Sequence, residues 1–369
     1  MLLAVSGDVI RLAPLTEPRP KTTRRTSQFG FAVLTSFALW LIGMPLLRMS
    51  QPLTVAASRG NNPETFLRIC DMASRLVEGP VRVTGSQFRS RLGDLTELSK
   101  EPFAIDSQVD NAGHRARMIT LRSLCRFADG AALYCLNQKQ SGDAAAIWLG
   151  LSRVGDGIVC GTDGSVSDVL AGLAIHSAAL NEYGNNREMF SQDQNRAMLV
   201  ELIEQERRRI TPDAIRRRCN ALNEQTYGWR LRFVMESQRV LSRPSHGELQ
   251  TFLTPSLQAI DDAILRRDRS RRLLMTELAI ELYRSEHGQL PSDLEMLTPS
   301  LLDRVPIDPF NPAGDVPLIY RVEGQKYLLY SVGHDGKDDG GVFGTEAQMY
   351  ESGLDFDIDT LNRSESAVE

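Results

Sequence analysis

The chain has 369 residues, of which 42% are hydrophobic and 24% charged, a composition that is ordinary for a protein with a buried core. At roughly 100–200 residues per domain, this length allows one large domain or two modest ones. The formal net charge of −5 gives no concentrated positive field, which argues against general nucleic-acid binding.

The first predicted element is a membrane span at residues 29–47, where the chain is apolar and carries no charged residue. A helix of this length covers about 28 Å, close to the hydrocarbon thickness of a bilayer. The segment before it is basic, through Arg11, Arg19, Lys21, Arg24 and Arg25. Because positive residues stay cytoplasmic, we expect a single pass through the inner (cytoplasmic) membrane, with the bulk of the chain outside. The alternative is a cleaved signal peptide, for which residues 55–58 offer a weak cleavage site.

The remaining chain is predicted to be mostly α-helical, as a helical bundle or a short solenoid, with a small α+β module at its C-terminal end. Apolar residues at helical spacing place helices at 66–78, 114–139, 143–155, 166–183, 194–241 and 253–287. Clusters of Gly with Asp or Ser predict turns at 141–143, 155–157 and 161–164, and Ser167 is expected to cap the next helix. The first of these turns resembles that of a tetratricopeptide unit, but no regular period of about 34 residues is present.

These elements divide the chain into six predicted segments. They are a disordered basic cytoplasmic tail (1–28), a transmembrane helix (29–47), a linker (48–65), an α-helical domain (66–250), the α+β module (257–360) and a disordered tail (361–369). In the helical domain we expect Trp148 to be buried, because it shares an apolar face with Ala144, Ile147 and Leu151. A second apolar face is predicted from Ile119, Leu121, Leu124, Phe127, Ala131, Leu133 and Leu136.

Signatures of catalysis are thin in this sequence. It holds no nucleophile elbow, zinc-protease motif, phosphate-binding loop or dinucleotide fingerprint. His176 lies on an apolar helix and is expected to be a core residue rather than a general base. The charged run from Glu204 to Arg218 is expected to be a solvated helix face, and Glu277 with Glu281 an ordinary surface pair. The five cysteines form no CxxC pair, which favours small buried side chains, although an oxidising compartment would allow a bridge.

Residues 271–341 carry the most informative pattern. An amphipathic helix ends at Gly288, and a short helix capped by Ser292 follows Pro291. Residues 305–310 must be extended, because each residue before a proline is excluded from the helical region. Alternation at 318–322 and 327–332, around a Glu323-Gly324 turn, then predicts an antiparallel hairpin.

The motifs of this region occur in the order A-x-E-L-Y-R-x-x-x-G-x-x-P, V-P-x-D-P-F and Y-x-L-Y-S-x-G-x-D-G-x-x-x-G-G. As a set they resemble the globular domain of the major pseudopilin of type II secretion systems. The matching residues are Glu281, Leu282, Tyr283, Arg284, Gly288, Pro291, Val305, Pro306, Asp308, Pro309, Phe310, Tyr320, Tyr327, Leu329, Tyr330, Ser331, Gly333, Asp335, Gly336, Gly340 and Gly341. The match covers less than a quarter of the chain. The order of span, helical middle and module also resembles membrane-anchored proteins common in planctomycete-type bacteria.

The chain departs from a pseudopilin in two ways. Gly30-Phe31 matches a prepilin cleavage junction, but Thr35 stands where a pseudopilin has glutamate. A pseudopilin also runs its span directly into the globular domain, whereas residues 48–256 intervene here. We therefore expect a related domain in another context rather than a polymerising pseudopilin.

The resemblance implies a structural Ca²⁺ ion in the glycine-rich loop after the hairpin. Its ligands would be the side chains of Asp335, Asp339, Asp355 and Asp357 and backbone carbonyls at Leu329 and Ser331. Oxygen-rich loops of this kind suit Ca²⁺, which takes six to eight oxygen ligands at roughly 2.3–2.6 Å. The alternative is an exposed acidic turn in which Asp and Gly satisfy the backbone geometry.

Together these features favour a non-enzymatic, membrane-anchored envelope protein with a scaffold or interaction role and a protein partner. One alternative is an envelope hydrolase whose site lies in the helical domain, which would need His176 beside a carboxylate in a cleft. Another is a true component of a secretion or pilus system. A groove lined by apolar and arginine side chains would favour binding.

Overall fold

The structure, a computed structural model, describes residues 63–77, 93–94, 97, 99–100, 111–161, 166–211, 213–215, 217, 250–344 and 354–359. The predicted span at 29–47 and both predicted tails lie outside these residues. Within them, no helix combines the length and the apolar character that a bilayer crossing needs.

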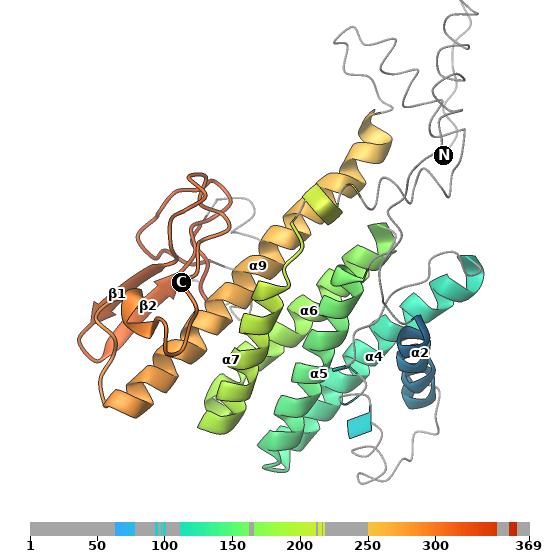
Figure 1. The fold of residues 1–369 in the computed structure, drawn as a ribbon, viewed down its shortest axis with the longest axis horizontal. Helices are drawn as coiled ribbons and strands as arrows, with labels where there is room; N and C mark the ends of the chain where they lie inside the picture. Colours follow the sequence, from blue (N-terminus) through green and yellow to red (C-terminus); the bar gives the residue numbers. More distant parts are fainter. Residues whose placement is uncertain are drawn as a thin grey trace, which may run out of the picture. The chain divides into compact units, whose positions relative to one another are not determined.

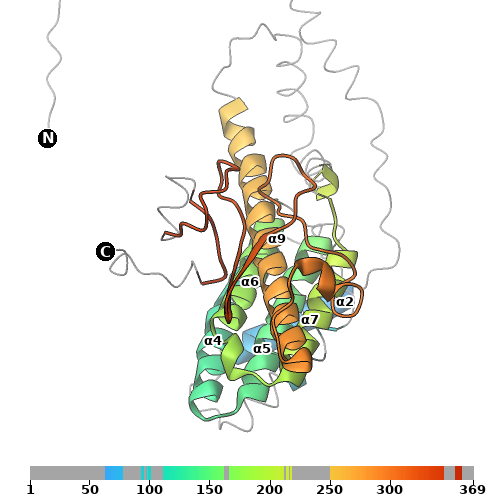
Figure 2. The same cartoon turned by 90° about the vertical axis from the view of Figure 1, so that its left-hand side faces the viewer.

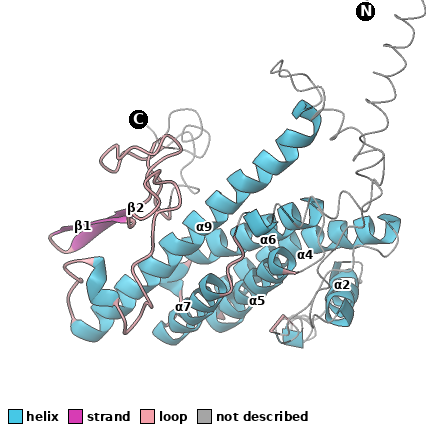
Figure 3. Ribbon diagram, turned by 45° about the horizontal axis from the view of Figure 1, so that its top comes forward, coloured by secondary structure: helices cyan, strands magenta, loops and turns pink. Residues whose placement is uncertain are grey.

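The described residues are mostly helical, as predicted (Figure 1 and Figure 3). The long helices are α2 (Pro63–Val77), α4 (Asn111–Asn137), α5 (Ser141–Cys160), α6 (Val166–Asn185), α7 (Gln192–Arg207) and α9 (Gln250–His287), with short 3-10 turns η1 (Arg187–Met189) and η2 (Leu294–Leu297). The predicted hairpin is confirmed as two antiparallel strands, β1 (Ile319–Glu323) and β2 (Lys326–Tyr330). Their register pairs Ile319 with Tyr330 and Glu323 with Lys326, and Gly324 takes a positive φ of 67° in the turn between them.

The helices pack in a chain of neighbours around one large hydrophobic core and a second, smaller one. Helix α2 packs on α4, α4 on α5, α5 on α6, and α9 lies along α6 and α7 (Figure 1 and Figure 2). Trp148 is fully buried at the centre, as expected, and donates a hydrogen bond from its indole Nε1 to Asp129 at 3.2 Å. Its ring meets the edge of Phe190 at 6.0 Å between centroids.

Helix α5 is longer than predicted, because the glycines expected to form turns at 141–143 and 155–157 lie inside it, whereas Gly161 of the third predicted turn ends it. Ser141, Gly142 and Asp143 form its first turn, where an acidic side chain suits the helix dipole. Gly155 lies where α5 and α6 cross, and a Cβ atom there would come within 2.5 Å of the His176 backbone nitrogen. These glycines therefore permit close helix packing and do not end the helix.

Other details of the predicted elements differ from the structure. Helix α7 covers the first part of the predicted helical region 194–241 and ends at Arg207, before Pro212, which disfavours a continuous helix, and residues 213–215 and 217 are helical again. Residues 218–249 lie outside the described part. Ser167 falls inside α6 and does not cap it, and the cap of η2 is Asp293, whose side chain accepts from the Met296 N–H, in place of Ser292.

The predicted apolar face of α4 is confirmed for only part of its residues. Leu121, Leu124 and Leu136 are buried, but Ile119 and Leu133 are exposed. Phe127 is also classed as exposed. These seven apolar positions are spread around the helix, so that they cannot all face one core.

Helix α9 joins the predicted helical domain to the predicted module. It runs for 38 residues, packs against α6 and α7, and also contacts β2 and η2. Near its middle, the Arg269 guanidinium lies 4.0 Å from the centre of the Phe356 ring. The hairpin and the segment around Phe356 are therefore held on the same helix that completes the bundle.

Candidate functional site

Asp308 holds the hairpin to the chain before it. Its carboxylate is buried and accepts hydrogen bonds from Ser331 Oγ at 2.6 Å, from Val332 N–H at 2.8 Å and from Phe310 N–H at 2.9 Å. Burial raises the pKa of Asp308, while these donors oppose the rise. The aspartate of the V-P-x-D-P-F motif thus fixes the start of the acidic loop.

The acidic loop itself, residues 333–341, is shaped by glycines and by internal hydrogen bonds. Gly336, Gly340 and Gly341 all have positive φ angles, which glycine adopts without strain. Asp338 accepts from Tyr330 Oη at 2.9 Å and from Gly340 N–H at 2.8 Å, and it pairs with Arg321 at 2.9 Å. This carboxylate therefore already has a positive partner.

Asp355 has a buried carboxylate that is only partly satisfied by hydrogen bonds. The residue is fully buried, and its Oδ2 accepts from Gly341 N–H at 2.9 Å. Its Oδ1 is also buried and has no hydrogen-bond partner among the described residues. Burial raises the pKa of Asp355 and the charges of Asp338 and Asp339 raise it further, while the backbone N–H groups of Gly341 and Asp339 oppose the rise. A cation would satisfy the bare oxygen and reduce this repulsion.

The predicted ligands are only partly brought together. Asp339 and Asp355 are close enough for their charges to interact, and Ser331 pairs with Phe356 through both backbone groups at 2.8 Å. Asp335 lies in its own turn, where Lys337 N–H donates to it at 3.0 Å and Lys337 Nζ pairs with it at 3.2 Å. Leu329 is buried in β2, and Asp357 is partly exposed beside Phe356. Within the described ranges, no group of three or more His, Cys, Asp or Glu side chains forms a ready metal site.

A second unusual feature is a buried charge cluster on α9, which the sequence did not reveal. Arg267 and Arg271 are fully buried, and both donate to Asp268 Oδ1, at 2.8–3.0 Å and 3.1 Å respectively. Arg209 pairs with the other oxygen of Asp268 at 2.9 Å. These arginines overcome the effect of burial and lower the pKa of Asp268 to about 2. Asp268 is therefore ionised at neutral pH and bound by three guanidinium groups.

Glu206 of α7 extends this cluster toward the surface. It pairs with Arg271 and accepts from Arg272 at 2.8 Å, and Arg272 also donates to the backbone carbonyl of Ile307 at 2.7 Å. Burial would raise the pKa of Glu206, but the two arginines lower it below its usual value. The expectation that the whole run from Glu204 to Arg218 is a solvated face is wrong at Glu206, although Arg207 and Arg208 are exposed.

His176 is a core residue, as predicted. It is fully buried, and its Nε2 lies 2.8 Å from the side-chain oxygen of Gln205, which has no proton to give and makes Nε2 the donor. Burial, with the charges of Arg267 and Arg271, lowers the pKa of His176 to about 3. The ring is neutral at physiological pH, and in the part of the chain that the structure describes its Nε2 is paired with an amide rather than a carboxylate.

Glu277 is buried, contrary to the expectation of a surface pair. It accepts from Arg187 Nε at 3.0 Å, and Arg187 also pairs with Asp359 at 3.0 Å. Glu281 is partly exposed and accepts from Tyr327 Oη at 3.0 Å. These two acids of α9 thus fasten η1, the C-terminal segment and the hairpin to one helix.

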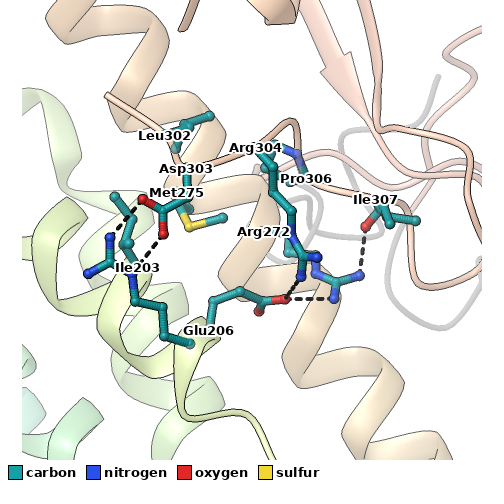
Figure 4. A pocket seen from close by; sticks show the side chains of 10 residues that line it. Ile203, Glu206, Arg272, Met275, Leu302, Asp303, Arg304, Pro306 and Ile307 are labelled. Carbon is teal, nitrogen blue, oxygen red and sulfur yellow. Dashed lines mark hydrogen bonds and ion pairs between the residues drawn. The ribbon is translucent and has the colours of Figure 1, made fainter. Parts of the chain in front are cut away.

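A pocket opens beside the charge cluster, between α7, α9 and residues 302–307 (Figure 4). It has a volume of about 140 Å³. Apolar walls come from Ile203, Met275, Leu302, Pro306 and Ile307, and charged groups from Glu206, Arg207, Arg272, Asp303 and Arg304. The charged side chains are arranged in pairs: Arg207 holds Asp303 through two bonds of 2.7 Å, and Arg304 lies 3.8 Å from Glu206. None of these ten lining residues is a histidine, cysteine, serine or threonine.

Comparison of the chain with known protein families, with curated proteins and with solved structures gave no match.

Proposed function

We propose that this chain is a membrane-anchored, non-enzymatic protein of the bacterial envelope that works as a scaffold or interaction component. Residues 29–47 would anchor it in the inner membrane, with the helical bundle and the C-terminal module outside. The module would be a pseudopilin-like α+β domain used away from a pilus, since Thr35 and the intervening residues 48–256 depart from a polymerising pseudopilin.

The observation that carries the interaction role is the lining of the α7–α9 pocket. Its walls combine apolar side chains with arginines and carboxylates, and its ten lining residues include no histidine, cysteine, serine or threonine. Such a surface can hold an apolar side chain in the pocket and polar groups at the rim. The pocket lies where the 302–307 segment meets the bundle, so a partner bound there would contact both parts of the protein.

A photoreactive amino acid at Arg304 tests this role in the native host. The Arg304 side chain is two-thirds exposed at the pocket mouth, so we expect a discrete crosslinked species with an envelope protein. Replacing the partly buried Ile203 by tryptophan should fill the pocket and remove the crosslink, while leaving the amount of protein unchanged. A probe at exposed Val342, outside the pocket lining, is the matched control. Equal crosslinking from both positions, or none from Arg304, would contradict the proposed site.

We propose further that Ca²⁺ stabilises the acidic loop. Support comes from the buried, unpartnered Oδ1 of Asp355 together with the charges of Asp338 and Asp339, whose carboxylates are hard ligands. Asp339 and Asp355 would hold the ion, with Asp335 and Asp357 and the carbonyls of Leu329 and Ser331 as the further ligands that the resemblance implies. When bound, the ion would neutralise the loop and fix it against β2.

Thermal unfolding of the full chain in detergent tests the ion. If Ca²⁺ binds only the folded state, it adds about 2.7 kcal/mol at a hundredfold excess over Kd, so a chelator should lower Tm and Ca²⁺ should restore it. Asp355→Asn should abolish the response, and the exposed Asp315→Asn should leave it intact. Asp335→Asn tests whether Asp335 is a ligand in addition to Asp339 and Asp355. It should weaken the effect of Ca²⁺ on Tm only if the turn at Asp335 reorganises around the ion. A Tm that changes with neither chelator nor Ca²⁺ would rule out the site.

A further inference from the structure

The outward side of α4 has an unusual composition for the surface of a helical bundle. Six side chains form what we call the α4 outer face: Ile119, Arg122, Arg126, Phe127, Leu133 and Tyr134. Ile119 is 59% exposed and Tyr134 60% exposed, and both arginines are exposed as well. Isolated exposed apolar residues are ordinary, but four large ones on one side of a single helix are more than isolated residues account for.

The geometry of the helix places these residues together. At 3.6 residues per turn, the six positions fall on one side of α4 and extend along about 22 Å of its length. The opposite side is formed by Leu121, Leu124 and Leu136, which are buried. There α4 packs against α2, α5 and α6, so the orientation of the outer face is fixed by the core.

The charge on this face has one sign. Asp129 is the only acidic residue of α4, and it turns toward the core, where Trp148 Nε1 donates to it at 3.2 Å. Arg122 and Arg126 therefore stand among apolar and aromatic side chains with no acidic residue of their own helix on that face. A positive face with Ile, Leu, Phe and Tyr is the composition of helices that lie against anionic lipid, where aromatic rings sit at the headgroup level.

We infer that the α4 outer face is a contact surface for an anionic lipid membrane. The inference rests on the proposed anchorage in one respect, namely that a span at 29–47 brings the face to a bilayer. Residues 48–62 separate that span from Pro63, the first residue of α2, and can reach at most about 50 Å. Because α2 packs on α4, a tether of this length would allow the face to reach the bilayer surface.

Lipid contact can be measured with the full chain reconstituted in bilayer nanodiscs that contain brominated phosphatidylcholine. Tyr134→Trp places a fluorescent probe on the face, and Val200→Trp places one at a similarly exposed position on α7. The fluorescence of each variant is compared with that of the parent chain in phosphatidylcholine alone and in an equal mixture with phosphatidylglycerol. We expect bromine to quench Tyr134→Trp more strongly than Val200→Trp, and more strongly with phosphatidylglycerol.

The arginines supply the second arm of this experiment. Each basic residue near an anionic leaflet contributes a factor of about five in binding, so Arg122→Glu with Arg126→Glu should reduce the contact by more than tenfold. Both side chains are exposed, so the fold should be unaffected. Raising the salt from about 0.1 M to about 1 M should have a similar effect, since it shortens the screening length from about 10 Å to about 3 Å.

The outcomes separate this inference from the proposed function. An anchored chain with equal quenching at the two probes would overturn the lipid-contact face. Quenching that is indifferent to phosphatidylglycerol and to the arginine reversals would overturn the assignment to anionic lipid. A Tyr134→Trp probe that is shielded from aqueous acrylamide but not quenched by bromine would assign the face to a protein partner instead. If carbonate washing releases the chain from membranes, the proposed anchor is wrong. The lipid-contact face would still be supported if the released chain binds vesicles and its Tyr134→Trp probe is quenched more strongly when they contain phosphatidylglycerol.

Discussion

Asp268→Asn should be strongly destabilising, by about 3–5 kcal/mol, because it removes the negative charge that three guanidinium groups share in the core. The replacement keeps the shape of the side chain but leaves buried Arg267 without the anion that it binds and Arg271 with Glu206 as its remaining anion. Arg271 should be affected most, since its Nε and Nη1 already have no hydrogen-bond partner among the described residues. Chemical denaturation followed by circular dichroism measures the change.

An exposed ion pair gives the matched control. Asp303 and Arg207 form a well-aligned pair with both side chains about half exposed, so Asp303→Asn should change the free energy of unfolding only slightly. If the two substitutions have the same small effect, the charge cluster on α9 is solvated and the burial of Asp268 is wrong.

The effect of Asp268→Asn should also depend on pH. Burial tends to raise the pKa of Asp268, but Arg267, Arg271 and Arg209 lower it to about 2, below its value in the unfolded chain. A lowered pKa in the folded state contributes stability that is present above the unfolded pKa of about 3.9 and is lost as the pH falls toward 2. The difference between wild type and Asp268→Asn should therefore be constant near neutrality and shrink between about pH 4 and pH 2. A difference that stays constant through this range would show that Asp268 is not ionised in the folded protein.

The burial of the charged cluster around Asp268 could not be predicted from the sequence. The run Arg266–Arg272 holds five arginines and one aspartate, a composition that usually indicates a solvated face. Its partners lie about 60 residues earlier, Glu206 in the last turn of α7 and Arg209 just after that helix, and no local pattern indicates that they meet. One signal was present: Leu273 to Tyr283 is apolar on more than one side of the helix, which is typical of a helix surrounded by other elements. A helix buried in this way carries part of the adjoining charged run into the interior.

The hairpin and the acidic loop could be predicted more fully, because their signals are local. Alternation around Gly324 determines the strand pairing, and prolines on either side of Asp308 determine the extended segment before it. The role of Asp308 as the acceptor of three hydrogen bonds depends on the approach of Ser331 and Val332 from the hairpin, which the sequence does not encode locally. The same limit applies to Asp355, whose burial follows from its pairing with the loop at Val342 and Gly341.

Trp148→Ala should also cost about 3–5 kcal/mol, because it removes the largest fully buried side chain of the bundle and leaves a cavity. The cavity would open beside Phe190, whose ring also packs on Tyr183 at 4.5 Å, so the loss should reach α6 as well as α5. Trp148→Phe retains most of the apolar volume and loses mainly the hydrogen bond to Asp129, so a smaller cost of about 1–3 kcal/mol is expected.

The comparison with Tyr134 makes this prediction specific to the core. Tyr134 is an aromatic residue of α4 that is 60% exposed, and Tyr134→Ala should change the free energy of unfolding by no more than about 0.5 kcal/mol. All three variants can be compared by urea denaturation monitored by circular dichroism. Fluorescence is unsuitable, because the Trp148 substitutions remove a fluorophore. An order of cost with Trp148→Ala largest, Trp148→Phe intermediate and Tyr134→Ala smallest would establish that α4, α5 and α6 share a core around Trp148. Similar midpoints for Trp148→Ala and Tyr134→Ala would place Trp148 at the surface and contradict the packing of α5 between its two neighbours.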